Sequence, residues 1–165
     1  LNEGSKVIFA ACGPKVRDLC TEVPEALRDL GEFGGARVVM PGVVVLEGPA
    51  FGSYGEAERQ LRGLTDALAA RGPLTECPLI VLVDDSGFAA ESLRNFLWVT
   101  FTRSNPSHDI YGVGAEYAWK HWGCDNVVID ARSKPHHAPP LVPDPAVEKR
   151  IDRLFARGGS LSGIL

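Results

Sequence analysis

Acidic side chains follow two apolar runs in this chain and could support chemistry. Asp84 and Asp85 come directly after the apolar run 79–83, and Asp130 follows a second run at 127–129. Clustered carboxylate oxygens bind hard cations, and a carboxylate can also act as a general base. Open α/β sheets place ligands at the carboxyl ends of their strands. One hypothesis is therefore a stand-alone metal-dependent enzyme that uses these three carboxylates.

The same carboxylates also have a structural interpretation. One member of the Asp84-Asp85 pair can cap the next segment while the other stays in solvent, and aspartate is a typical turn residue. No second acidic pair occurs at motif spacing, so we favour the structural interpretation for Asp84 and Asp85. Asp130 and the basic residues after it could form a cleft with the Asp84-Asp85 pair, or Asp130 could be a turn residue, and these two interpretations stay level.

Arg103 follows a predicted helix at 91–102 and could bind a carboxylate or phosphate through two guanidinium nitrogens. The favoured interpretation is an ion pair with Asp109 or a contact with the free carbonyls of the helix end. Tyr117, Trp119 and Trp122 form an aromatic cluster. This cluster is either a partner surface, because aromatic residues dominate interface energies, or a lid over the core.

The elements that must position these side chains alternate between strands and helices. Short runs rich in β-branched residues are typical of strands, here at 38–40, 43–46, 79–83, 110–113 and 127–129. Helical spacing of apolar residues predicts helices over 2–30 with a break at Gly13-Pro14, from Ser53 to the Gly72-Pro73 stop, over 91–102, and from Asp144 to Gly158. This order predicts an α/β fold with a layered, open, mixed sheet flanked by helices.

We expect one α/β domain over residues 1–165. It comprises a mainly helical lead-in segment at 1–30, a core at 36–157 and a tail at 158–165. A chain of 165 residues that is 45% hydrophobic can bury one core. Because the chain begins at Leu1 and not at methionine, we expect it to be a piece of a longer polypeptide.

Composition excludes some classes of function. The net charge of −4 offers no electrostatic basis for binding nucleic acid, and no apolar stretch is long enough to span a membrane. The four cysteines form no C-x-x-C pair, which favours reduced thiols in a cytoplasmic protein.

An ordered set of motifs resembles the C-terminal domain of UbiD-type decarboxylases. A strand ends in Val83-Asp84-Asp85, and the segment 97–103, LWVTFTR, leads into Asn105-Pro106. The later segment 129–134, IDARSK, is similar to the family's acid-Ala-Thr-x-Lys segment, with Arg132 where threonine is commoner. The resemblance assigns a family-signature or structural role to Asp84, Asp85, Trp98, Arg103, Asp109, Asp130 and Lys134.

The resemblance implies an activity for a full-length protein. Members of this family are reversible (de)carboxylases of aromatic or α,β-unsaturated acids, and one group makes a ubiquinone precursor from a polyprenyl-hydroxybenzoate. They use prenylated FMN with a divalent metal and a monovalent cation. Their cofactor motif and catalytic residues lie in a larger N-terminal part that has no counterpart here. We therefore expect this chain to hold no catalytic, cofactor-binding or metal residue.

The resemblance also implies partners. The family's C-terminal domain forms dimers and closes against the active site, so we expect an oligomerisation and lid domain. Its partners would be further copies, as a dimer or a larger homo-oligomer, and the N-terminal cofactor domain of the same or another chain. The segment 46–49, LEGP, departs from the family because it is acidic where many relatives are basic. An alternative is a separate non-catalytic subunit of a multi-subunit carboxylase.

Overall fold

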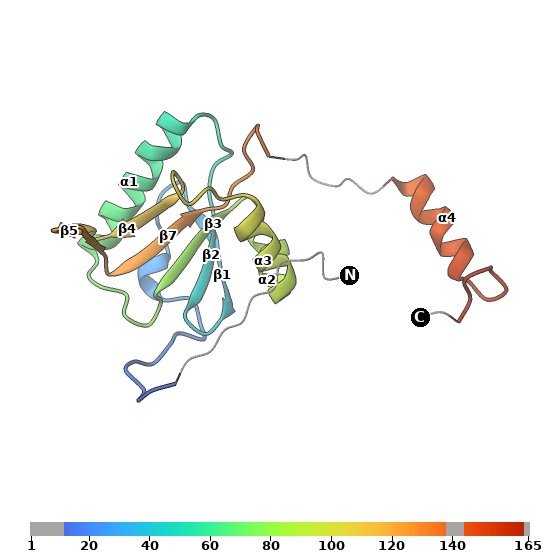
Figure 1. Ribbon diagram of the computed structural model, residues 1–165, viewed down its shortest axis with the longest axis horizontal. Coiled ribbons are helices and arrows are strands. Elements are labelled where there is room, and N and C mark those ends of the chain that lie inside the picture. Colours follow the sequence, from blue (N-terminus) through green and yellow to red (C-terminus); the bar gives the residue numbers. More distant parts are fainter. Residues whose placement is uncertain (1–11, 138–143, 164–165) are drawn as a thin grey trace. The chain divides into compact units, whose positions relative to one another are not determined.

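The structure is a computed structural model that describes residues 12–137 and 144–163 (Figure 1). Contacts within the chain define two compact units, Leu1–Lys134 and Pro135–Leu165. The first unit contains the sheet, and the described residues of the second contain the helix α4 (Pro145–Phe155). None of the described helices has the length and the hydropathy needed to cross a bilayer.

Five strands form a mixed sheet in the order β1-β2-β3-β7-β4. Their bounds are β1 Gly34–Met40, β2 Val43–Glu47, β3 Leu79–Val83, β4 Ile110–Val113 and β7 Asn126–Asp130. The three central strands β2, β3 and β7 run parallel, while the edge strands β1 and β4 pair antiparallel with β2 and β7. Pro41-Gly42 is the turn between β1 and β2, and Gly42 has the positive φ of 81° that glycine tolerates. The predicted mixed sheet is confirmed.

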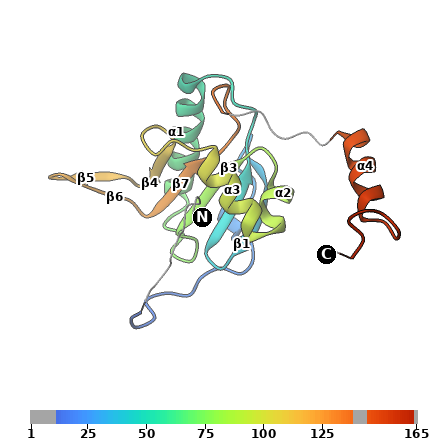
Figure 2. The ribbon, with the colours of Figure 1, turned by 45° about the vertical axis from the view of Figure 1, so that its right-hand side comes forward.

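Helices cover both faces of the sheet because the central strands are apolar on both sides. One face packs against α1 (Tyr54–Ala70), so that Leu46, Leu82 and Leu64 share a cluster. The other face packs against α3 (Leu93–Thr102), which brings Val81 and Phe96 together. Alternate residues of β2 and β3 thus enter opposite layers, and Figures 1 and 2 show α1 and α3 on different sides of the strands.

The helix starts follow local capping rules. The Ser53 side chain accepts a hydrogen bond from the Glu56 amide at the start of α1, as predicted. The predicted helix over 91–102 corresponds to α3, which begins at Leu93 because extended Ser92 caps it. A separate short helix, α2 (Ser86–Glu91), lies before Ser92 and shares only Glu91 with the predicted range. At α4, Asp144 accepts from the Ala146 amide at 2.8 Å, which confirms the predicted start.

The predicted helix over 2–30 is wrong for the residues from 12 onward. This part holds only a short 3-10 turn, η1 (Glu25–Leu27), and Gly13-Pro14 and Pro24 interrupt any longer helix. Residues 2–11 lie outside the described residues. The helical spacing of Val147, Ile151, Leu154 and Phe155 predicts a buried face for α4, but none of the α4 residues is buried within its own unit. For the residues after Lys134, membership in a single core over 36–157 stays a prediction.

Two further strands were not predicted. β5 (Glu116–Ala118) and β6 (His121–Gly123) form an antiparallel hairpin that protrudes from the first unit in Figure 2. Each strand has three residues, and the turn at Trp119-Lys120 contains no glycine or asparagine. The usual sequence signals of a hairpin are therefore missing.

Candidate functional site

The parallel strands β2, β3 and β7 end at one edge of the sheet, and acidic residues gather there. Glu47 is the last residue of β2 and pairs in register with Val83 of β3, whereas Asp130 ends β7 opposite Leu82. Asp84 and Asp85 follow β3 directly. The sheet therefore brings together the carboxylates of two distant segments, as the sequence predicts.

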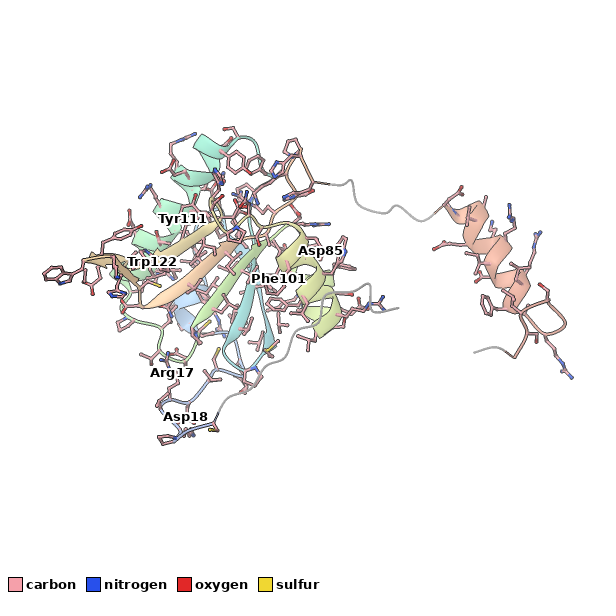
Figure 3. All side chains as sticks on the ribbon, in the orientation of Figure 1. Arg17, Asp18, Asp85, Phe101, Tyr111 and Trp122 are labelled. Atoms are coloured by element: carbon pink, nitrogen blue, oxygen red, sulfur yellow. The ribbon has the colours of Figure 1, made fainter. Side chains whose placement is uncertain are left out.

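Asp84 and Asp85 have structural partners. The Asp85 carboxylate accepts from the Phe88 amide at 2.9 Å and caps α2, and Figure 3 labels Asp85 beside this helix. Asp84 Oδ2 accepts from Arg103 Nη1 at 2.9 Å and from the Ser133 amide at 2.8 Å. Asp85 thus caps the next segment, as the structural interpretation expects, whereas Asp84 is exposed but also accepts these two hydrogen bonds.

Arg103 lies between a carboxylate and an aromatic ring. Its guanidinium carbon lies 5.1 Å from the centre of the Trp98 ring, and its ion pair is with Asp84. The predicted pair with Asp109 is wrong, because Asp109 instead lies in a buried cluster with another cation. Sequence proximity favoured Asp109, but the fold brings the end of β3 closer to Arg103.

That buried cluster contains two acids and two bases, Asp109, Asp130, Arg132 and Lys134, which we call the edge network. Their side chains are at most 3% exposed. Arg132 donates from Nε and Nη2 to the two oxygens of Asp130, each at 2.9 Å. Lys134 Nζ lies 3.4 Å from Asp109 Oδ2 and 3.8 Å from Asp130 Oδ1. The formal charges cancel, which is the condition under which buried ions are tolerated.

The other donors of the edge network hold neighbouring loops. Arg132 Nη1 donates to the Pro49 carbonyl and to Gln60 Oε1, each at 2.8 Å. Lys134 Nζ donates to the carbonyls of Arg103, Asp130 and Arg132. The network therefore ties the β2–α1 loop, α1 and the segment after α3 to the end of β7.

The edge network also affects Tyr54 at the start of α1. Burial raises the pKa of the Tyr54 phenol, and the negative charges of Asp109 and Asp130 raise it further. The Tyr54 ring packs 5.2 Å from Phe51 and 5.6 Å from His108. Tyr54 therefore stays a neutral hydroxyl at pH 7.

A metal or a flavin phosphate does not fit this edge. In the ranges 12–137 and 144–163, no group of three or more histidine, cysteine, aspartate or glutamate side chains could hold a metal ion. Asp84, Asp85 and Asp130 are each engaged by protein donors. The cations that would bind a phosphate at the end of β7 already donate within the network. The residues at this edge therefore do not fit a metal or the phosphate of the prenylated FMN that the resemblance implies.

Exposed aromatic side chains form two surfaces on the first unit. On the β5–β6 hairpin, Trp119 is 100% exposed and Tyr117 is 81% exposed, so the interpretation as a core lid is wrong. On α2 and α3, Phe101 is 69% exposed, and Phe88 lies edge-on to Trp98 with ring centres 6.3 Å apart. Figure 3 labels Trp122 and Phe101, which represent the two surfaces.

Two cavities of about 690 and 510 Å³ lie away from the edge network. The larger is lined by residues 16–18, 73, 75–76 and 124–125, near the amino ends of β3 and β7, and Figure 3 labels Arg17 and Asp18. The smaller involves residues 23–36. Neither of these two cavities is lined by a signature residue.

Comparison with known proteins gives partial matches to decarboxylases. No family model matches the chain. A 4-hydroxybenzoate decarboxylase subunit from Chlamydia pneumoniae is 30% identical over 155 residues, which are 92% of this chain and 24% of that protein. An uncharacterised protein of Chlamydia caviae is 34% identical over 113 residues, 67% of this chain and 17% of that protein. The chain thus spans about a quarter or less of the length of these relatives.

Solved structures with partial similarity have also been found. An evolved dimeric form of the UbiD-class enzyme HmfF from Pelotomaculum thermopropionicum, in complex with prFMN, has a TM-score of 0.46 and 17% identity, covering 75% of this chain and 26% of that one. The vanillic acid decarboxylase of Sedimentibacter hydroxybenzoicus has a TM-score of 0.45 and 15% identity, covering 78% and 30%.

Proposed function

Because this chain belongs to the UbiD-like decarboxylase family as a segment of about a quarter of its relative's length, we propose that it is the assembly and lid domain of a UbiD-like carboxy-lyase. The substrate class would be aromatic or α,β-unsaturated carboxylic acids, for example the polyprenyl-hydroxybenzoate of ubiquinone biosynthesis. Prenylated FMN would be bound elsewhere in the full-length protein. A cytoplasmic location is part of the proposal.

The observation that carries this proposal is a contrast between the carboxyl ends of the parallel strands and the exposed surface of the first unit. At the carboxyl edge, where an enzyme of this topology would hold its ligand, the four charged side chains of the edge network are buried and bonded to one another. On the surface, Trp119 and Phe101 are exposed although aromatic side chains gain energy from burial. This distribution supports a domain that is rigid inside and contacts other protein surfaces.

In this proposal the edge network positions protein segments and performs no catalytic step. Arg132 holds the β2–α1 loop through the Pro49 carbonyl, and Lys134 holds the end of α3 through the Arg103 carbonyl. Asp109 accepts from the Asn105 amide at 2.6 Å and keeps the following turn closed. These bonds would keep the lid surface in one shape when it closes on a cofactor domain.

The first test is the oligomeric state of the native polypeptide that contains this chain. Size-exclusion chromatography with light scattering should show a dimer or larger assembly, and Trp119→Ser should shift it toward monomer. Val16→Ser is a matched control, because Val16 is 82% exposed but lies outside both aromatic surfaces. A protein that stays monomeric at the highest attainable concentration would contradict the assembly role.

The second test is the length of that native polypeptide. Since the matched segment is 24% of the relative, a protein of the same design is about four times as long as this segment. Intact mass spectrometry of the native protein would show this directly. A mass near the 17.7 kDa of this chain would instead favour a separate non-catalytic subunit.

A further inference from the structure

Cys20 and Cys77 come from distant parts of the chain and meet where the parallel strands begin. The Cys20 amide donates to the carbonyl of Glu76, the residue before Cys77, at 2.8 Å. Cys20 also packs against the apolar cluster that contains Cys77. Hydrogen-bonded neighbouring chains lie roughly 5 Å apart, which is within the Cα separation that a disulfide requires.

Both cysteines are held in place by their backbones. The Cys20 carbonyl accepts from the Gly42 amide at 2.9 Å, so that Cys20 is bonded on both sides. The Cys77 amide donates to the Leu74 carbonyl, and the Cys77 carbonyl accepts from the Asn126 side chain at 2.8 Å. The two thiols are free in this structure. The two thiols also interact with each other, because a hydrogen bond with Cys20 acts on the Cys77 thiol.

We propose that Cys20 and Cys77 form a regulatory disulfide when the protein meets a low-molecular-weight disulfide such as oxidised glutathione. The bond would fasten the segment 12–24, which contains no helix or strand, to the loop before β3. This inference does not rest on the proposed function.

The two sulfurs have different parts in the reaction because their exposure differs. Cys20 is partly exposed, whereas Cys77 is fully buried. The Cys20 thiolate attacks the small disulfide, forms a mixed disulfide and releases one thiol. Cys77 then attacks the Cys20 sulfur, the bond to the small molecule breaks, and a second thiol leaves with the proton. Two protein thiols are oxidised, and one small disulfide is reduced to two thiols.

Cys77 is suited to the second step and not to the first. Burial raises the pKa of its thiol to about 12, and a hydrogen bond with Cys20 contributes to this shift. A buried, protonated thiol does not react with a disulfide in solution. Once Cys20 carries the mixed disulfide, Cys77 lies beside the sulfur it attacks. Its small thiolate fraction then reacts at a high effective concentration, and the proton it loses ends on the departing thiol.

Oxidation would make a weak attachment covalent. In the reduced protein, the segment before Cys20 is held by Arg17, whose Nη1 donates to the Thr75 carbonyl at 3.3 Å, and by Leu19, which packs on Gly42. The residues of the segment 12–19 are exposed. A disulfide at Cys20 would keep the chain at this end of the sheet until a thiol reduces the bond.

The test is mass spectrometry of the native polypeptide after incubation in buffers with increasing ratios of oxidised to reduced glutathione. Remaining thiols are alkylated, and the protein is digested with trypsin without reduction. Cys20 then lies in the peptide 18–28 and Cys77 in the peptide 72–94. We expect these two peptides to be joined, with the loss of two hydrogen atoms, and to separate when dithiothreitol is added.

Variants separate this pair from the other cysteines. Cys20→Ser should abolish the joined peptide and leave Cys77 reduced, whereas Cys12→Ser and Cys124→Ser should leave the joined peptide unchanged. Circular dichroism checks that each variant is folded. The proposal is overturned if Cys20 accumulates as the glutathione adduct while Cys77 stays reduced. It is equally overturned if the joined peptide forms only in denaturant, or if Cys20 pairs with Cys12 or Cys124.

Discussion

Replacing Arg132 by methionine tests whether charge balance inside the edge network stabilises the first unit. Arg132 is fully buried and donates four side-chain hydrogen bonds, two of them to Asp130. Methionine keeps most of the length but removes the charge and all four donors. Two buried carboxylates then face only Lys134. Removing one partner from a buried pair costs about 3–5 kcal/mol, and we expect Arg132→Met to lower the free energy of unfolding by this amount.

A second substitution separates the charge from the loss of packing. Adding Asp130→Asn to Arg132→Met leaves Asp109 and Lys134, whose charges cancel. The double variant should therefore lose less stability than the sum of the two single variants, by about 1 kcal/mol or more. The Pro49 carbonyl and Gln60 still lack their donor in the double variant. Its stability therefore stays below that of the unsubstituted protein.

The assay is urea unfolding of this chain followed by circular dichroism. Arg62→Met is the matched control, because Arg62 also pairs with an acid, Glu58, but on the exposed side of α1, and its unfolding midpoint should not change. If Arg132→Met lowers the free energy of unfolding by less than about 1 kcal/mol, the reasoning is refuted, because removing one partner of a buried ion pair costs more than this. Additive effects in the double variant would refute the role of charge balance.

Other predictions concern local contacts and pH. Asp85→Ala removes the cap of α2 and should cost about 1 kcal/mol, with faster amide hydrogen exchange in α2, whereas Asp85→Asn should keep most of the stability. Arg71→Met removes three hydrogen bonds to the carbonyls of the loop 26–29 and should raise amide exchange in that loop alone. The pKa of Cys77 is about 12 in the folded protein against 9.0 for an ordinary thiol, so the unfolded chain loses this proton first. The stability that Cys77 contributes is thus complete below pH 9 and is lost as the pH rises toward 12. Unfolding midpoints measured between pH 9 and 12 should therefore fall less steeply for Cys77→Ala than for the unsubstituted protein.

Local patterns in the sequence predicted several elements closely. The bounds of β3 (Leu79–Val83) match its apolar run, because a strand buried on both faces leaves a continuous apolar segment. The bounds of the edge strand β4 (Ile110–Val113) also match the predicted strand. The start of α1 was predictable from Ser53, since a cap depends on residues within one turn. The prediction of a helix from residue 12 onward is wrong. It relied on the helical spacing of apolar residues, but Pro14 and Pro24 interrupt a helix there.

Partners of the charged residues were not predictable in the same way. Arg103 pairs with Asp84, 19 positions away, although Asp109 is nearer in sequence. Arg132 contacts Gln60 and Pro49, which are 72 and 83 positions away. Such contacts depend on which strands are neighbours, and strand order does not follow from the apolar pattern.

The sequence by itself determined that the chain alternates strands and helices, that acids follow two of its strands, and that its motifs resemble one family. These properties are local, because hydrophobic period and capping involve residues a few positions apart. Tertiary structure alone decided that Asp130 and Lys134 are buried in a balanced network and that Trp119 is exposed. The cost of burying a charge depends on through-space neighbours and on excluded water, and both exist only once the strands have paired and the helices have packed.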